Sequence, residues 1–445
     1  MTSATADTRT ARPPRRHLPP HIPRPHLPRA TFAALAVPNF RLYVGGQAVA
    51  NTGTWIQNIA LDWLVLQLTG SPAAVGVAMA LQFTPILLFG MHGGMLADRY
   101  PKRTILLVTQ LLNACVALAL AVLTVTGAIT VGLVYVLALV GGLVFAVDNP
   151  TRQSFVSEVV PAHHLRNAVA LNAAVFQTTR LVGPAVASVL IAGVGTGWAF
   201  GINALCYLGP TLALAAMSTA ALVRHPVAPR AKGQLRSALR YVRERPHVAW
   251  TIALVGVFGT FGLNFPVVLT AMASRTFDGD AGLYGFFNVV VAVGSIAGAL
   301  IAGGRTHTRL RLIVALGAAF GVAQLLAAFA PTLELFVVAL VAMGVTNLAF
   351  QAMANSTVQL SVDPEYRGRV MGLYVLVFIG GTPFGAPLIG WVTEHAGVRA
   401  GMAVCGAVPL LAALVIGAVL ARRAARLERG TVPAAVPATA PTAVR

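Results

Sequence analysis

The chain has few charged residues, since only 10% of its 445 residues are Asp, Glu, Lys or Arg. A soluble globular domain carries about 25% charged residues, so this composition excludes an ordinary soluble fold. Hydrophobic residues make up 57% of the chain, and the mean hydropathy is +0.75. The composition therefore indicates a polytopic membrane protein.

Acidic residues are especially scarce. Against 32 Lys and Arg there are 13 Asp and Glu, which gives a formal net charge of +19. In a soluble protein such an excess would suggest a nucleic-acid partner. Here the basic residues gather between and outside the apolar segments, so membrane topology explains them better. We expect the lipid bilayer, and no nucleic acid, as the partner of this surface.

Cysteine is also rare, and the signatures of several enzyme classes are absent. Cys115, Cys206 and Cys405 all lie inside apolar segments, which argues against a disulfide framework or a cysteine metal site. The sequence contains no Walker motif, no His-Glu-x-x-His and no Gly-x-Ser-x-Gly. We therefore expect a protein that is not an enzyme and binds neither a metal nor another cofactor.

The chain contains many apolar segments of about 20 residues, which is long enough to cross a bilayer. The sequence predicts an all-α polytopic protein with twelve transmembrane helices, near residues 43–67, 74–97, 104–126, 130–150, 168–193, 198–222, 248–272, 281–303, 311–330, 333–356, 369–392 and 398–421. On this map 29 of the 32 basic residues, Arg152 among them, fall in the tails and loops of one side. Only Arg275 and Arg399 fall on the other side, and Arg180 lies within the fifth span. The positive-inside rule then predicts that both termini are cytoplasmic.

A polar segment divides these spans into two halves. We expect a disordered basic cytoplasmic tail at 1–37, six-helix halves at 38–222 and 248–423, a cytoplasmic linker at 223–247 and a disordered tail at 424–445. The halves repeat weakly, because Gly183-Pro184 in the fifth span matches Ala386-Pro387 in the eleventh. Parallel repeats of this kind occur in secondary transporters.

The turn between the second and third spans carries an ordered set of small, acidic and basic residues. It has the form Gly-x-x-x-Asp-Arg-x-x-Lys-Arg, with Gly94, Asp98, Arg99, Lys102 and Arg103. This order resembles the loop 2–3 signature of the major facilitator superfamily, with Pro101 where that pattern usually carries Gly. The resemblance implies a gating loop whose carboxylate, Asp98, helps to hold one conformation closed.

One face of the first span is polar. Five side chains fall within one narrow arc of the helix, namely Gln47, Asn51, Thr54, Asn58 and Asp62. Such a stripe must face protein or water, so it either bonds to neighbouring helices or forms a wall of an aqueous substrate cavity. The tenth span repeats the spacing with Asn347, Gln351 and Asn355, which we expect to face the first stripe across the cavity.

Ionisable residues at membrane depth are few: Asp62, Asp148 and Arg180. Each costs about 3 kcal/mol or more at the bilayer centre unless it is paired or hydrated. We expect proton coupling from Asp62, which would load a proton near the outer mouth, and from Arg180, which would compete for the carboxylate. A static polar contact is the alternative. Asp148, near the cytoplasmic end of the fourth span, is the next candidate for proton coupling, and a structural helix-end role is at least as strongly favoured for it.

The fifth span resembles the Gly-Pro element of drug/proton antiporters, with a predicted kink at Gly183 and Pro184. With Asn39-Phe40-Arg41 and Asn149-Pro150-Thr151-Arg152, residues 38–423 resemble the enterobactin-exporter-like and macrolide- or multidrug-efflux-like branch of the superfamily. The resemblance implies the major facilitator fold, in a monomer of the bacterial cytoplasmic membrane. It also implies proton-driven export, by alternating access, of a small, mostly apolar antibiotic, siderophore or other metabolite. A proton-linked importer and a non-transporting membrane scaffold are the alternatives.

Overall fold

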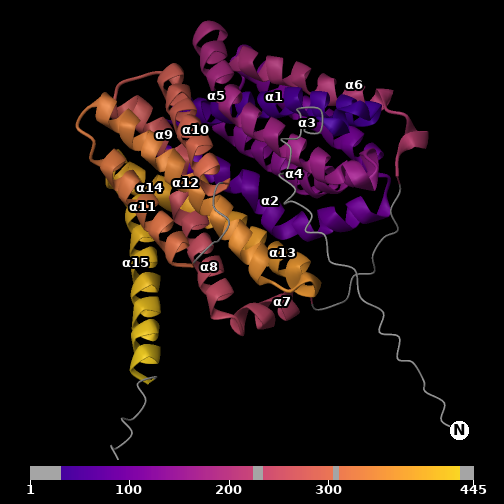
Figure 1. Ribbon diagram of the computed structural model, residues 1–445. Coiled ribbons are helices and arrows are strands. Elements are labelled where there is room, and N and C mark those ends of the chain that lie inside the picture. Colours follow the sequence, from indigo (N-terminus) through magenta and orange to yellow (C-terminus); the bar gives the residue numbers. More distant parts are fainter. Residues whose placement is uncertain (1–31, 224–233, 304–309, 431–445) are drawn as a thin grey trace, which may run out of the picture.

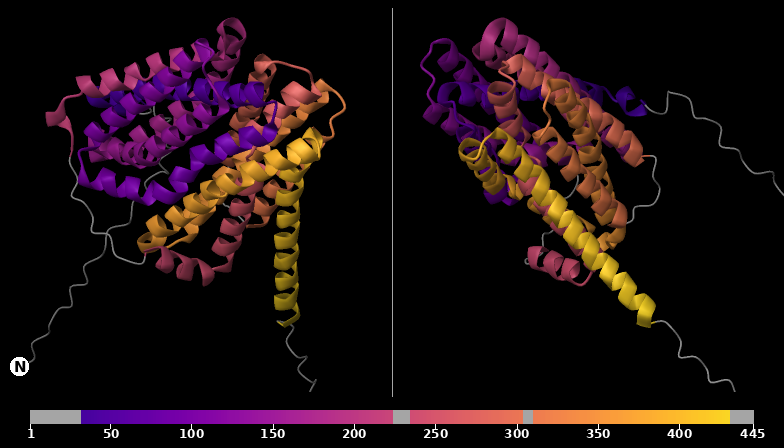
Figure 2. Two further views of the ribbon diagram at one scale, coloured as in Figure 1. Left: turned by 180° about the vertical axis from the view of Figure 1, so that it is seen from behind. Right: turned by 90° about the vertical axis from the view of Figure 1, so that its left-hand side faces the viewer.

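The computed structural model describes residues 32–223, 234–303 and 310–430, and most of both predicted tails lies outside these ranges. All regular secondary structure in the described ranges is helical. The helices form two groups that lie side by side, the amino-terminal group in indigo to magenta and the carboxyl-terminal group in orange to yellow (Figure 1, Figure 2). The first group contains the helices before residue 223, and the second contains those from residue 234 onward.

The amino-terminal half begins with a short 3-10 helix, Ala33–Ala36, inside the segment predicted as a disordered tail. Its long helices are α1 (Pro38–Thr69), α2 (Pro72–Arg99), α3 (Lys102–Val125), α4 (Val131–Val159), α5 (Ala162–Cys206) and α6 (Leu208–Ala216). Within α5 the residue Gly195 has φ +82°, which only glycine adopts readily, so the chain reverses there. The part of α5 before Gly195 is the fifth span, and the part after it forms the sixth span together with α6.

The carboxyl-terminal half follows a linker helix, α7 (Gln234–Arg243), which the sequence analysis did not predict. The seventh span combines α8 (Pro246–Val257), a π-helical turn (Phe258–Gly262), α9 (Phe265–Ala271) and a second π-helical turn (Met272–Thr276). The remaining helices are α10 (Ala281–Gly303), α11 (Leu310–Ala328), α12 (Leu333–Ser361), α13 (Pro364–Gly380), α14 (Thr382–His395) and α15 (Val398–Gly430). Helices α13 and α14 together make the eleventh span.

These helices account for twelve spans. Ten helical segments of the described chain are long and apolar enough to cross a membrane, and one of them, Ala162–Ala216, contains two spans. The twelfth is α1, which is less apolar because it carries the polar stripe. The predicted all-α fold with twelve membrane helices is therefore confirmed.

The helix ends differ from the predicted spans. Helix α4 continues to Val159 rather than 150, and α12 continues to Ser361 rather than 356. Hydropathy locates the part of a helix inside the bilayer core, whereas the helix continues through its polar end. Helix α15 likewise runs to Gly430, beyond the predicted boundary at 423, in a sequence rich in the good helix formers Ala and Arg.

The spans alternate in direction, so the bundle has two ends. The tail end holds the start of α1, the turn at Tyr100–Pro101 and α7, and the Gly70 end holds the turns at 70–71, 127–130, 277–280 and 396–397. Across the halves, α2 packs on α14 and α5 packs on α10. Helices α2 and α14 approach each other closely near the Gly70 end, where a Cβ atom at Gly76 would lie 2.3 Å from the carbonyl oxygen of Ala386 and one at Gly390 would lie 2.8 Å from the Cα of Ala73. The two halves are thus closed on each other at the Gly70 end.

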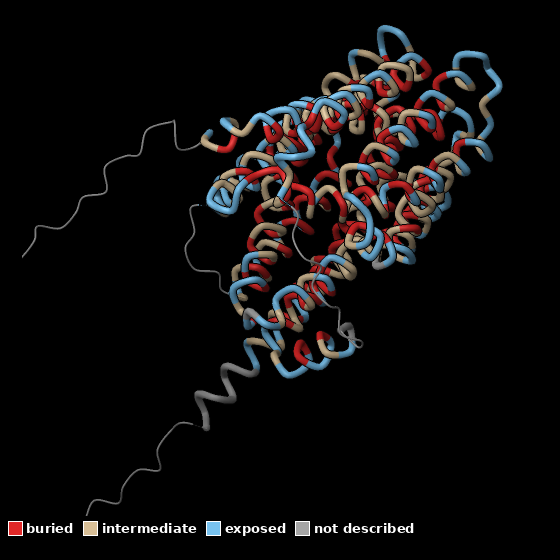
Figure 3. Tube along the Cα trace, turned by 90° about the vertical axis from the view of Figure 1, so that its right-hand side faces the viewer, coloured by how far each residue is buried: buried red, intermediate tan, exposed pale blue. Residues whose placement is uncertain are grey.

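Buried residues lie mainly on the faces that the helices turn toward each other, and exposed residues lie on the outside of the bundle (Figure 3). The exposed positions include large apolar side chains such as Leu118, Val189 and Leu300, which are 55%, 73% and 73% exposed. An outer surface of this kind suits contact with lipid chains.

Close helix packing makes a first prediction about Gly298 of α10. A Cβ atom there would lie 2.1 Å from the carbonyl oxygen of Val345 in α12, so Gly298→Ala should destabilise the fold by about 1–3 kcal/mol. The matched control is Gly141→Ala, because no heavy atom of the described chain lies within 4 Å of a Cβ at Gly141. Thermal unfolding in detergent should show a lower Tm for the first variant only, and equal Tm values would contradict the packing.

Candidate functional site

A buried carboxylate lies at the centre of the amino-terminal half. Asp148 of α4 is fully buried, and its Oδ1 accepts hydrogen bonds from Thr109 Oγ1 at 2.7 Å and Gln110 Nε2 at 3.0 Å, both on α3. Its Oδ2 forms an ion pair with Arg152, one helical turn further along α4. The charge of Asp148 is therefore compensated within its own half.

Arg152 extends the same set of contacts to α1. Its guanidinium donates to Gln47 Oε1 at 2.8 Å and to Asn51 Oδ1 at 3.2 Å. We call Asp148, Arg152, Gln47, Asn51, Thr109 and Gln110 the polar cluster. It joins α1, α3 and α4 inside a membrane-spanning half, where unsatisfied polar groups are costly.

The polar cluster corrects two interpretations of the sequence. Asp148 is not a helix-end residue, because α4 continues to Val159 and the side chain is fully buried. Arg152 does not belong to a loop, so it should not be counted among the residues that set the topology. The i, i+4 spacing of an acid and an arginine was the signal in the sequence that could have revealed the pair.

The polar stripe of α1 divides between two directions. Gln47 and Asn51 meet Arg152 inside the amino-terminal half, and Thr54 Oγ1 lies 3.4 Å from the Tyr207 hydroxyl of the same half. Asn58 is half-buried. Asp62, in contrast, faces the other half. The stripe is therefore not one continuous wall.

Asp62 makes a hydrogen bond across the two halves. Its side chain is buried, and its Oδ2 accepts from the hydroxyl of Tyr284 on α10 at 2.8 Å. The ring of Tyr284 also stacks on Trp63, with ring centroids 6.5 Å apart. Because the two helices belong to different halves, this bond exists only while the halves are closed here. Tyr284 was not predicted, and the 222 residues between the partners leave no local signal.

Arg180 is half-buried on α5, and among the described residues neither Asp62 nor Asp148 pairs with it. Four residues later, Pro184 lies inside the helix, and the backbone angles remain helical through it. Gly183 lies against α1, where a Cβ atom added to this glycine would be 2.4 Å from the Cβ of Trp55. The non-helical residue of α5 is Gly195, so the kink at Gly183 and Pro184 stays a prediction.

The polar residues of α12 bond to one another along their own helix. Asn347 is fully buried, and its Oδ1 accepts from Gln351 Nε2 of the same helix at 2.5 Å. Asn355 Oδ1 accepts from Gln359 Nε2, also on α12, at 2.6 Å. In the described chain these hydrogen bonds run along α12, and the arrangement of these residues across a cavity from α1 stays a prediction.

The predicted gating loop is anchored to its own half. Lys102 Nζ lies 2.5 Å from Glu158 Oε1 at the end of α4, and Arg103 donates to the carbonyl oxygens of Leu214 at 2.7 Å and Ala215 at 2.9 Å. Arg103 thereby supplies donors and positive charge to the carboxyl end of α6. Asp98 and Gly94 are half-buried, and Arg99 is exposed.

A close approach of α2 to α4 lies next to this loop. A Cβ atom at Gly93 would be 2.1 Å from the carbonyl oxygen of Ala146. Gly93, the residue before Gly94 of the loop motif, therefore permits close packing of α2 on α4.

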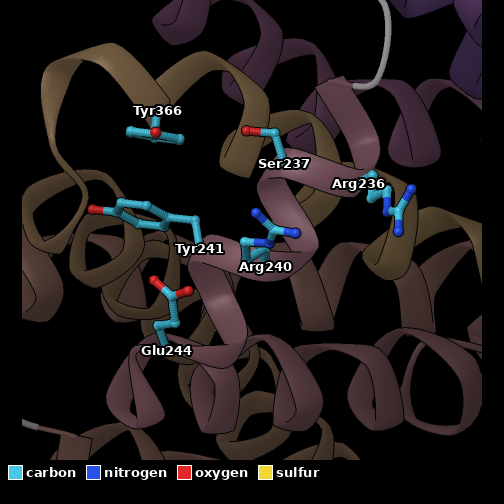
Figure 4. A pocket seen from close by; sticks show the side chains of 6 residues that line it. All are labelled: Arg236, Ser237, Arg240, Tyr241, Glu244 and Tyr366. Atoms are coloured by element: carbon cyan, nitrogen blue, oxygen red, sulfur yellow. The ribbon is translucent and has the colours of Figure 1, made fainter.

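A separate pocket of about 390 Å³ lies at the tail end, between α7 and α13 (Figure 4). The ring of Tyr241 stacks on that of Tyr366 with centroids 4.5 Å apart, and Arg245 lies 4.0 Å above the Tyr241 ring while pairing with Asp363 at 2.9 Å. These contacts fix α7 to the carboxyl-terminal half. None of the site residues predicted from the sequence lines this pocket.

Two halves of six membrane-spanning helices each form an architecture found in secondary transporters. No group of three His, Cys, Asp or Glu residues that could hold a metal occurs in the described ranges. The chain belongs to the transmembrane secretion effector family of the major facilitator superfamily, whose profile matches residues 29–434. It is a transporter and not an enzyme.

Several curated relatives are named as efflux proteins. The chain is 25% identical over 362 residues to the multidrug efflux pump Tap of Mycolicibacterium fortuitum, covering 79% of this chain and 88% of Tap. It is 23% identical over 384 residues to macrolide efflux protein A of Streptococcus pyogenes, covering 83% and 93%. A crystal structure of a peptide transporter of the POT family has the same fold, with TM-score 0.70, 13% identity and coverage of 86% and 94%.

The polar cluster predicts a large effect of removing one partner. Arg152→Met should cost about 3–5 kcal/mol of stability, because it leaves Asp148 buried and unpaired. The double variant Asp148→Asn with Arg152→Met should recover most of this loss, since no uncompensated charge remains. Thermal unfolding of Arg152→Met, Asp148→Asn and the double variant would measure the coupling energy between the two residues. Additive losses of stability would contradict the coupling.

Proposed function

We propose that this transporter exports a small, mostly apolar compound from a bacterial cell and is driven by protons that move inward. The efflux activities named for the relatives support this direction. We place the protein in the cell membrane with both termini in the cytoplasm. The unequal distribution of basic residues supports that orientation. The chain acts as a monomer in this proposal.

In this orientation the Gly70 end faces the outside and the tail end faces the cytoplasm. The described conformation, closed at the Gly70 end, is then the inward-facing state of an alternating-access cycle. To reach the outward-facing state, the Gly70 end must open. There α1 must separate from α10, and α2 must separate from α14.

The observation that carries the proposal is the hydrogen bond between Asp62 and Tyr284. When the halves separate at the Gly70 end, the Asp62 carboxylate loses its donor and meets outside water, where it can take up a proton. Reclosing returns the carboxylate to a buried site, and release of the proton toward the cytoplasm restores the acceptor for the Tyr284 hydroxyl. One charge crossing a membrane potential of about 100 mV supplies about 2.3 kcal/mol for this cycle.

Arg180 and Asp148 have subsidiary roles in the proposal. Arg180 has no acidic partner among the described residues, so it is available to attract the Asp62 carboxylate when the helices shift. Asp148 is the second proton acceptor candidate, but its ion pair with Arg152 must open before it can act.

We place the substrate route along the half-buried polar residues. Thr54 and Asn58 of α1 lie between the polar cluster and Asp62, and Gln351 and Asn355 of α12 are half-buried. Gln47, Asn51 and Asn347 are buried in this conformation and would join the route only as the helices move. A few polar anchors among apolar side chains suit a mostly apolar substrate.

Asp62→Asn should abolish uphill efflux while substrate binding is retained. The neutral side chain still meets Tyr284 but cannot carry a proton, so accumulation in inverted vesicles should lose its dependence on the pH gradient. The matched control is Tyr284→Phe, which removes the hydrogen-bond donor and keeps the carboxylate, and should retain some coupled transport. Wild-type, pH-dependent accumulation in the Asp62→Asn vesicles would rule out Asp62 and leave Asp148 as the candidate.

Asp98→Asn should impair transport much more than folding, because the gating-loop acid helps to hold one of the two conformations. Cysteine accessibility on the two faces of the membrane should change relative to the wild type. Glu244→Gln is the control, since it removes an exposed acid at the same end of the bundle. Transport at the wild-type rate with unchanged accessibility would refute the gating role.

Transport in vesicles of both orientations also tests the direction. A resistance and accumulation screen with a compound library, with and without the gene, provides the substrate. Uptake into inverted vesicles, in which the cytoplasmic face is outside, supports export. Uptake only into right-side-out vesicles would show an importer.

A further inference from the structure

The carboxyl-terminal half supplies an acid to the first turn of α2. Glu394, in the last turn of α14, accepts a hydrogen bond through its Oε2 from the backbone N–H of Ala73 at 3.2 Å. The same oxygen accepts from the hydroxyl of Ser71. These partners lie more than 300 positions away in the sequence and belong to the other half.

Helix α2 gains a cap from both halves in this arrangement. The first N–H groups of a helix have no partner inside the helix, and Pro72 has no N–H at all. Ser71 caps α2 in the ordinary way by accepting from the Ala74 N–H at 3.2 Å, and Glu394 takes the Ala73 N–H. The carboxylate also places a negative charge at the positive end of the helix dipole.

A second side chain of the carboxyl-terminal half holds the same turn. Arg275, at the end of the seventh span, donates to the carbonyl oxygen of Gly70. Gly70 follows the last residue of α1 and has φ +64°. The C=O group of Gly70 is therefore bonded to a cation, and the Ser71 hydroxyl and the Ala73 N–H are bonded to an anion. Gly390 lets the two helices come close enough for this, because any side chain there would meet the backbone of Pro72 and Ala73.

We propose that Glu394 and Arg275 form a latch that holds the two halves closed at the Gly70 end. The latch is conformation-dependent, because the carboxylate caps α2 only while α14 lies against it. When this end opens, α2 loses the acceptor for the Ala73 N–H, and the carboxylate leaves the helix dipole. Glu394 acts here as a positioning residue that sets the ratio of the two states, and it does not need to contact substrate or proton. This inference rests on the alternating-access cycle proposed above.

The test measures the opening of the Gly70 end directly. Spin labels at Thr126→Cys in the amino-terminal half and Pro331→Cys in the carboxyl-terminal half report the distance across it, after Cys115, Cys206 and Cys405 are replaced by Ala. Glu394→Ala should raise the ratio of open to closed states about two- to five-fold, the effect of one charge at a helix terminus. Arg275→Gln, a second and independent variant, should shift the ratio in the same direction, and Glu394→Gln should shift it less than Glu394→Ala.

The matched control is Glu334→Ala, which removes an exposed acid at the same end of the bundle, in the first turn of α12. It should leave the distance distribution unchanged. Unchanged distributions in Glu394→Ala and Arg275→Gln, in a wild-type background that opens when substrate or acid is added, would overturn the latch and leave the transport proposal standing. Unchanged distributions in a wild-type protein that never opens would overturn both.

Discussion

A bilayer provides no water to solvate a charge, so a carboxylate buried inside this protein depends on a partner supplied by the protein. The amino-terminal half meets this requirement internally through the ion pair between Asp148 and Arg152. Asp62 meets it through Tyr284, which belongs to the other half. The first arrangement survives any rigid movement of the halves, and the second does not. A membrane acid whose partner depends on conformation is the simplest physical basis for coupling a proton to a movement.

The same principle applies at the edge of the membrane. The first turn of α2 needs acceptors for its N–H groups, and one of them comes from Glu394 of the opposite half. Close helix contacts at Gly390 and Gly76 bring the halves together at this end, while Lys102, Glu158 and Arg103 bond within one half at the other end. The closed end of the molecule thus contains the bonds that the transport cycle must break.

Hydropathy predicted the number of spans. It did not predict where the helices end, because α4 and α12 continue as helices after their sequences become polar. The gating-loop lysine and arginine were identified, whereas their partners at Glu158 and the end of α6 could not be, since those contacts depend on how α3 packs.

The candidate site was predictable only in part, for a related reason. Helical periodicity identified Asp62 and its polar stripe, but it shows which residues share a face and not what that face meets. Gln47 and Asn51 bond to Arg152, while Asp62 bonds to Tyr284 far along the chain. In α12 the spacing of Asn347 and Gln351 is that of a hydrogen bond between them along the helix, which periodicity alone does not distinguish from a cavity-lining face.

The most direct test of the account is substrate-dependent proton movement in proteoliposomes that contain the purified transporter and an internal pH-sensitive dye. With a substrate gradient as the sole driving force, the account predicts that protons move in the direction opposite to the substrate. Substrate transport without any accompanying proton movement would contradict it.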